Sequence, residues 1–259
     1  MFTYDFMRTA FLAAGIVALI SGLAGYALVL RGQTFAGHAL SHVGFTGATG
    51  AVLLGVAPLW GMTAATLLAG AGMGWMGASL AQRDVAIGMV LAVALALGLL
   101  FLHWYTAFAS QATALLFGNV LGVDHAALWA LLAIGVVCLS GLAALARPLL
   151  FATVLPEVAQ ARGVPVRLVD TLFLALVALA TAACTQVVGV LLVFVLLVAP
   201  AATAQRLTAR LGLGLVLSAA FSLFAAWGGL ALAWQSDLPV SVCITALAAL
   251  AYAAVSLRG

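Results

Sequence analysis

Charged residues are scarce in this sequence, and lysine is absent from it. Only 6% of the 259 residues are charged, 67% are hydrophobic, and all nine basic residues are arginine. A soluble domain carries roughly 25% charged and about 45–50% apolar residues. With a mean hydropathy of +1.31, the chain has too few polar side chains to cover an apolar core. Lipid must surround most of it, so the sequence indicates an integral membrane protein.

The missing lysine excludes a further class of protein. A phosphate-cradling P-loop requires a lysine after its glycines, so any use of ATP must reside in another subunit. The arginines form no basic run, which argues against nucleic-acid binding.

Cysteine is also rare and is placed without a metal-binding or disulfide pattern. Cys138, Cys184 and Cys243 all lie within apolar stretches, with no close spacing, and are interpreted as small buried hydrophobes. We expect no permanently bound cofactor.

The N-terminus lacks a basic segment, and the apolar run 9–30 exceeds the roughly 7–15 residues of a signal-peptide core. It is therefore expected to be a retained spanning helix.

Apolar blocks of spanning length fill nearly the whole chain. A helix needs about 20 residues to cross the hydrocarbon. The expected fold is all-α, a polytopic transmembrane bundle of about eight or nine helices in one domain covering residues 1–259. The predicted blocks are 9–30, 35–55, 59–81, 86–106, 126–146, 168–184, 187–205, 212–234 and 239–257.

The stretch 168–205 decides between eight and nine helices. As one helix it would run about 57 Å, which is too long for a bilayer. Thr185, Gln186 and Gly189 offer a place to turn, so we expect two short passes.

The arginine positions predict the orientation. With nine helices, only Arg8 lies on one side, and the opposite side is cytoplasmic by the positive-inside rule. The N-terminus is then expected outside and the C-terminus inside. The eight arginines on the cytoplasmic side are Arg31, Arg83, Arg147, Arg162, Arg167, Arg206, Arg210 and Arg258.

Two histidines lie within the second predicted helix. His38 and His42 are four residues apart, so both imidazoles share one helix face. Counted from Arg31, they lie about 10 Å and about 16 Å into the membrane. Ionisable groups at that depth mark a pathway or a site, and imidazole is a common zinc, copper and nickel ligand. One helix supplies two ligands of a tetrahedral zinc site, and a symmetric dimer would supply four.

The histidine pair has two other interpretations. In the first interpretation, the histidines are neutral and hydrogen-bonded to neighbouring helices. In the second they belong to a metalloprotease, but the sequence continues with Ala39 and Leu40 instead of the glutamate of H-E-x-x-H. With no carboxylate available locally, an intramembrane enzyme is disfavoured.

The longest predicted cytoplasmic segment, 148–166, contains signals for a short helix. Pro156 suits the first helical position, Glu157 favours the positive helix end, and Gly163 suits the position after the end. Pro165 prevents continuation. A helix from Pro156 to Arg162 is expected, with Val158, Ala159 and Ala161 as apolar surface for a groove on a partner; a solvated connector is the alternative.

Together these segments resemble the permease family of bacterial zinc, manganese and iron ABC importers. The segment 35–44, FAGHALSHVG, is similar to the family's G-D-x-x-x-H segment in an early helix. The segment 156–166, PEVAQARGVPV, looks like the coupling loop that contacts the ATPase. The segment 186–204 is much like the family's V-G-x-L-L-V…P-A-A-x-A helix, with the sequence QVVGVLLVFVLLVAPAATA. The likeness runs from about residue 8 to 257.

The resemblance implies a type II-like importer permease in the bacterial cytoplasmic membrane. It would be a homodimer or pseudo-dimer working with a cytoplasmic ABC ATPase and an extracytoplasmic metal-binding protein, without enzymatic activity of its own. His38 corresponds to the family's aspartate and His42 to its histidine. Replacing a carboxylate by imidazole favours zinc over harder ions such as manganese, so zinc import by alternating access is expected, with manganese or iron as the other metals.

The resemblance also assigns the cytoplasmic loop and leaves two outer residues open. Coupling to the ATPase is expected at the residues Pro156, Glu157, Ala161 and Gly163. Leu155 stands where the family usually has an acidic residue, which weakens the helix N-cap. Asp124 and His125 lie on the predicted outer loop. They either assist the entry of the ion or form a solvated turn.

Two further transport functions remain open at this point. One is a permease of the same architecture for a chelated metal or a cofactor. The other is a stand-alone metal channel or secondary carrier.

Overall fold

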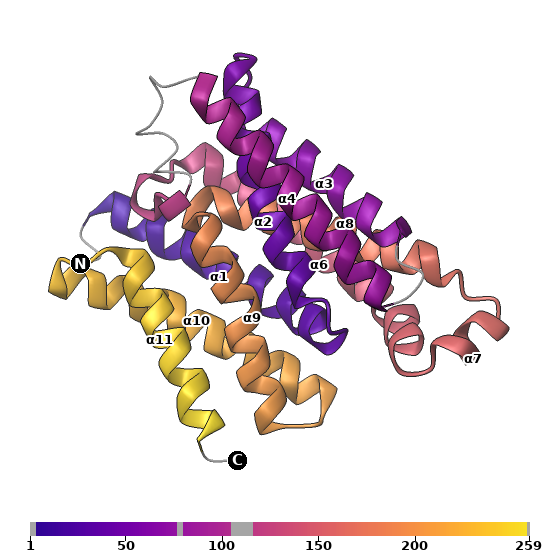
Figure 1. Ribbon diagram of the computed structural model, residues 1–259. Coiled ribbons are helices and arrows are strands. Elements are labelled where there is room, and N and C mark those ends of the chain that lie inside the picture. The colour runs from indigo at the N-terminus through magenta and orange to yellow at the C-terminus, as the bar shows by residue number, and fades with distance from the viewer. Residues whose placement is uncertain (1–3, 77–79, 105–115, 258–259) are drawn as a thin grey trace. The chain divides into compact units, whose positions relative to one another are not determined.

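The described part of the chain consists of helices, with no strand among its residues (Figure 1). A computed structural model describes residues 4–76, 80–104 and 116–257, with the backbone alone described for residues 80–83. The elements are α1 (Asp5–Leu30), α2 (Thr34–Leu53), α3 (Pro58–Met76), α4 (Leu80–Trp104), η2 (Val120–Gly122), α6 (His125–Val154), α7 (Pro156–Ala161), α8 (Val166–Val188), α9 (Val190–Leu207), α10 (Leu211–Ser236) and α11 (Val240–Ser256).

Every predicted apolar block corresponds to one long helix, so the all-α prediction is confirmed. Six helices of the described residues are long and apolar enough to cross a membrane, and α11 is apolar but shorter. The six are α1, α6, α8, α9, α10 and the segment Asp84–Trp104 of α4. The helices α2 and α3 are of similar length but are not among these six, because their hydropathy is lower. The helix α2 carries both candidate metal ligands.

The break between α8 and α9 falls at Gly189, as predicted. Gly189 has φ +83°, a conformation that glycine adopts at little cost. Its N–H bonds the Thr185 carbonyl at 2.9 Å, and its own carbonyl accepts the Val193 N–H at 3.1 Å. One glycine therefore ends α8 and begins α9, and the long stretch forms two helices.

The helix α6 is longer than predicted. The sequence placed its end near residue 146, but it continues through Arg147 and Pro148 to Val154. A proline removes one backbone donor, but its fixed φ near −65° is helical, so the helix can persist. The connecting segment predicted at 148–166 is therefore helical in its first part.

The chain divides into two compact units. The first comprises residues 1–34, 110–135 and 183–259, and the second comprises 35–109 and 136–182. Each is described separately, and the single domain expected from the sequence stays a prediction.

In the first unit α1 packs against α9 and α10, and α10 and α11 lie beside each other (Figure 1). At the crossing of α1 and α9, a Cβ on Gly25 would overlap the Leu197 carbonyl, so only glycine permits this approach. The Ser218 hydroxyl donates to the Gly22 carbonyl at 2.6 Å, joining α10 to α1. Small residues and interhelical hydrogen bonds are the usual basis of helix packing in lipid.

The second unit contains α2, α3, α4, α7 and the adjoining parts of α6 and α8. Gly70 and Gly74 of α3 face α8, where a Cβ would lie 2.7 Å from the Leu174 oxygen and 2.5 Å from the Thr171 Cα, respectively. Cys138 of α6 donates from its thiol to the Leu176 carbonyl at 3.3 Å. This unit therefore also relies on small-residue contacts.

Candidate metal centre and coupling helix

The helix α2 positions the two candidate ligands. It spans the 20 residues Thr34–Leu53, so His42 lies close to its middle. The ring centres of His38 and His42 are 4.8 Å apart, and their planes meet at 81°. Both side chains are partly exposed. The structure thus brings the two imidazoles together, as their spacing predicted.

The neighbours of the pair on α2 include an aromatic ring and two hydroxyl groups. Phe35 stacks beside His38 with ring centres 6.4 Å apart, and the buried Ser41 hydroxyl bonds the Gly37 carbonyl at 3.0 Å. One turn beyond His42, the Thr46 hydroxyl donates to the Ala94 carbonyl of α4 at 2.6 Å. These hydroxyl groups satisfy backbone carbonyls, and the Thr46 bond attaches the histidine-bearing helix to α4.

Two imidazoles are fewer than a metal ion usually requires. Within residues 4–76, 80–104 and 116–257, no group of three or more His, Cys, Asp or Glu side chains gathers closely enough to hold a metal ion. A tetrahedral zinc site takes four ligands, so the pair needs donors from elsewhere to complete a coordination shell.

The predicted helix after α6 is present as α7. The Ala159 and Arg162 amides bond the carbonyls of Leu155 and Val158. The helix ends where the amides of Gly163 (φ +80°) and Val164 turn back onto the carbonyls of Gln160 and Ala159, a Schellman-type stop. Leu155 provides no side-chain cap. Local sequence signals therefore determine both ends of α7.

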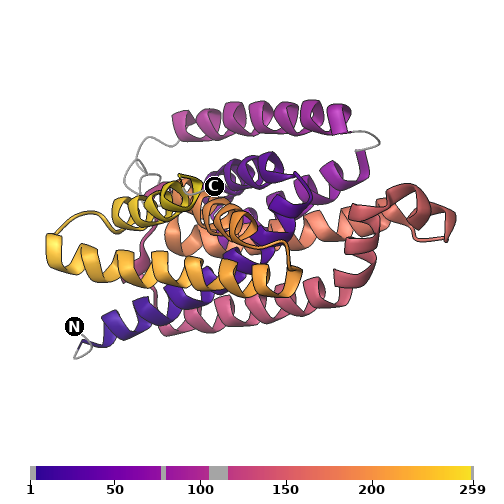
Figure 2. The ribbon, with the colours of Figure 1, turned by 90° about the horizontal axis from the view of Figure 1, so that it is seen from below.

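One part of the α7 prediction is wrong. Ala159 is fully buried, so it faces the protein and is not available to a partner. The exposed apolar surface of this segment comes from Val154 (70% exposed), Leu155 (50%) and Val158 (43%). Pro156, Glu157, Ala161 and Gly163 are exposed, as coupling residues need to be. In both views α7 lies at the far end of α6 and α8 (Figures 1 and 2).

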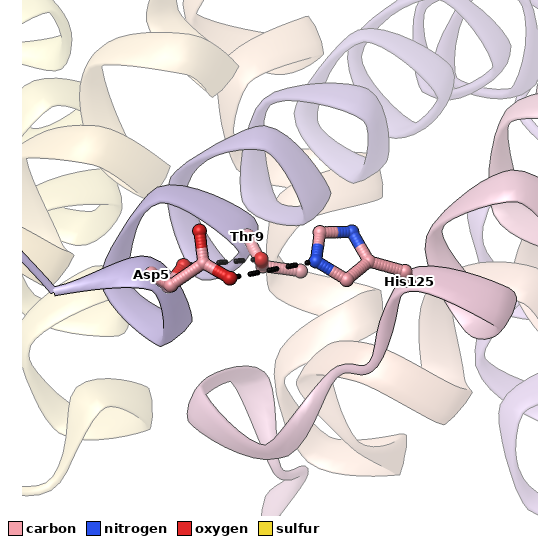
Figure 3. A network of polar contacts seen from close by, with 3 residues as sticks. All are labelled: Asp5, Thr9 and His125. Atoms are coloured by element: carbon pink, nitrogen blue, oxygen red, sulfur yellow. Dashed lines mark hydrogen bonds and ion pairs between the residues drawn. The ribbon is translucent and has the colours of Figure 1, made fainter.

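Asp124 and His125, whose role the sequence left open, both have structural partners. The Asp124 carboxylate accepts the Ala127 N–H at 2.7 Å and so caps the start of α6. The His125 Nε2 lies 3.6 Å from the Asp5 carboxylate at the start of α1, next to Thr9 (Figure 3). Sequence reasoning missed Asp5, because nothing local links it to a residue so far along the chain. His103, by contrast, is an exposed residue in the last turn of α4.

A multi-pass helical bundle that carries two partly exposed imidazoles on one helix face and a short helix between two long ones indicates a membrane transport subunit. The family model described as "ABC 3 transport family" matches residues 3–259, and the chain belongs to this family. It is the permease subunit of an ATP-driven metal importer in the bacterial inner membrane, a transport component that works with an ATPase and a substrate-binding protein.

Relatives and solved structures agree with this assignment. The chain is 33% identical over 254 residues to the manganese transport system membrane protein MntC of Halalkalibacterium halodurans, covering 98% of this chain and 87% of the relative. It is 30% identical to the manganese import system permease protein ScaB of Streptococcus parasanguinis, covering 93% and 86%.

Among solved structures, PsaBC from Streptococcus pneumoniae in complex with Fab matches with a TM-score of 0.86 at 27% identity, covering 97% of this chain and 91% of that chain. An inward-facing putative metal-chelate type ABC transporter matches with a TM-score of 0.73 at 17% identity, covering 97% and 86%. At that identity the second match shows the fold alone.

Proposed function

We propose that this permease imports a divalent first-row metal ion and that His38 and His42 hold the ion transiently near mid-membrane. The observation that carries this proposal is the pair of imidazole rings 4.8 Å apart in the first half of α2, with His42 close to the middle of the helix. Ionisable groups in a spanning helix are expensive and mark pathways. Neutral imidazole is also the commonest protein ligand for metal ions.

Two copies of the chain would complete the coordination shell. Because the described residues hold no third His, Cys, Asp or Glu beside the pair, a homodimer with α2 near its two-fold axis supplies four imidazoles. Such a site binds the cation without a fixed negative charge, which suits a transient site that must release its ion. We infer that the N-terminus lies outside, since that orientation leaves eight of nine arginines cytoplasmic.

Manganese is the cargo that we assign first. It is the metal named for the relatives from Halalkalibacterium halodurans and Streptococcus parasanguinis, which align with more than nine-tenths of this chain. Zinc is the second candidate. It is favoured by the donor set itself, because imidazoles without a carboxylate suit zinc better than manganese.

ATP-driven movement would reach the membrane helices through α7. The exposed Leu155 and Val158 provide apolar surface, and Glu157 adds one charge. A short amphipathic helix of this kind fits a groove on a partner. The ATPase would therefore bind the segment 154–163. Closure of the ATPase would open the site alternately to the two sides of the membrane.

Uptake of radioactive manganese and zinc tests the proposal. Cells that lack their own importers for these metals would express the complete transporter with wild-type chain, His38→Ala or His42→Ala. Each substitution should lower uptake by about tenfold or more, since even outer-shell losses at metal sites have effects of that size. His103→Ala is the matched control, because this histidine is exposed at the end of α4, and its uptake should equal wild type.

Three outcomes would contradict the proposal in different ways. Uptake that survives both substitutions would favour a chelated cargo that needs no imidazole ligands. Metal flux through the purified chain in liposomes without an ATPase would assign a channel or secondary carrier. Zinc uptake that excess manganese does not inhibit would replace manganese by zinc as the cargo.

A further inference from the structure

A cavity of about 450 Å³ opens on the surface of the first unit, between α1 and α10. Arg8, Phe11 and Leu12 of α1 line it together with Trp227 of α10. Leu12 is 59% exposed and Trp227 45% exposed, so the cavity is a groove on the face of this unit. Its lining is apolar except at one end, where Arg8 lies.

The floor of the groove is held in place. The Trp227 indole N–H donates to the Phe11 carbonyl at 3.0 Å. Beside it, Gly15 leaves room for the ring, since a Cβ there would lie 3.1 Å from the Trp227 Cζ2 atom. The indole therefore lies flat on α1 with its polar group satisfied, and it presents a rigid apolar surface.

Because α1 is long and apolar enough to cross a membrane, the groove would run from the membrane interface into the hydrocarbon region. α1 begins at Asp5 and α10 ends at Ser236, and the rings of Tyr4 and Trp234 at these two ends are 6.1 Å apart. Such aromatic residues are typical of the headgroup level. At 1.5 Å per residue, Arg8 lies about 4.5 Å below the start of α1 and Leu12 about 10 Å below it.

Charges follow a fixed order along this face of α1. Asp5, Arg8 and Leu12 are spaced i, i+3 and i+7, so they share one side of the helix. From the hydrocarbon outwards the order is apolar groove, cation, anion. Asp5 is 81% exposed, and its carboxylate lies 3.6 Å from the His125 Nε2. A phospholipid with an ethanolamine headgroup has the complementary order of acyl chain, phosphate and ammonium.

We propose that this groove binds an ethanolamine phospholipid from the leaflet at the N-terminal end of α1. One acyl chain lies along Trp227 and Leu12, the phosphate accepts hydrogen bonds from the Arg8 guanidinium, and the ammonium points to the Asp5 carboxylate. A guanidinium carries five donors in a planar fork that matches phosphate. The exposed carboxylate at the rim disfavours headgroups with net negative charge.

Native mass spectrometry of the complete transporter tests the site. The protein would be purified in an equal mixture of ethanolamine, glycerol and choline phospholipids with identical acyl chains. Wild type should retain one ethanolamine lipid per permease chain, several-fold above the other two. Arg8→Gln should lower its retention about fivefold or more. Arg210→Gln is the matched control, because this exposed arginine lies at the opposite end of α10.

The headgroup preference has its own test. Asp5→Asn should raise retention of the glycerol lipid to that of the ethanolamine lipid, whereas His125→Gln should leave the preference intact. Thermal unfolding in detergent confirms that each exposed substitution still folds. Equal retention of all three lipids by wild type, or unchanged ethanolamine retention in Arg8→Gln, would overturn the proposal.

Discussion

The Thr46 hydroxyl of α2 donates a 2.6 Å hydrogen bond to the Ala94 carbonyl of α4, one helical turn beyond His42. The same hydroxyl also lies 3.2 Å from the His42 carbonyl. It therefore joins the histidine-bearing helix to its neighbour beside the candidate metal centre.

We expect Thr46→Val to destabilise the protein by about 1 kcal/mol, since hydrogen bonds between membrane helices average about 0.6 and reach about 1.7 kcal/mol. Metal uptake should fall as well, because α2 loses its anchor to α4. Unfolding in detergent measures the first effect. Thr63→Val is the control, as that hydroxyl bonds the carbonyls of Leu59 and Trp60 in its own helix. Equal destabilisation by both substitutions would contradict the role given to Thr46.

Gly74→Ala should lower stability by about 1–3 kcal/mol, as is usual when a packed contact is overfilled. The added methyl group would lie 2.5 Å from the Thr171 Cα and 2.9 Å from its nitrogen, so α3 must move away from α8. Gly72→Ala, on the same helix, meets no atom within 4 Å and should unfold at the wild-type temperature. The prediction fails if the two variants behave alike in a thermal melt.

His38→Asp should shift the ratio of manganese to zinc uptake upwards by several-fold. A carboxylate is a harder ligand than imidazole and suits manganese, while losing a nitrogen donor weakens zinc binding. Competition between the two radioactive ions in the same cells measures the ratio. His38→Asn, which removes the imidazole without adding charge, separates the effect of the carboxylate from simple loss of a ligand. A ratio that stays constant in His38→Asp would mean that this side chain does not contact the ion.

Val158→Glu should abolish most metal-stimulated ATP hydrolysis while leaving the permease folded. Val158 is 43% exposed on α7, so a charge there costs little in the isolated chain but disrupts an apolar contact with the ATPase. Leu257→Glu provides a control at an 87% exposed position after α11. Hydrolysis by the reconstituted complex gives the measurement, and normal coupling in Val158→Glu would remove α7 from the interface.

The helical fold could be predicted from the sequence because lipid imposes a strict rule on chain segments. Backbone polar groups in the bilayer must be satisfied within a helix, so apolar run length predicts each element. Gly189 could be recognised as a break for the same reason, since it interrupts a run too long to cross once. The end of α6 could not be placed this way, because a helix can continue past Arg147 and Pro148 beyond the hydrophobic run.

The pairing of His38 with His42 was determined by sequence alone, because the helical repeat brings residues four apart onto one face. Only the tertiary structure decided that Ala159 turns inward, that Asp5 meets His125, and that Trp227 bonds Phe11. Packing between helices sets these relationships, and it depends on side-chain shape at crossings. Residues more than a hundred positions apart leave no periodic signal of such contacts in the chain.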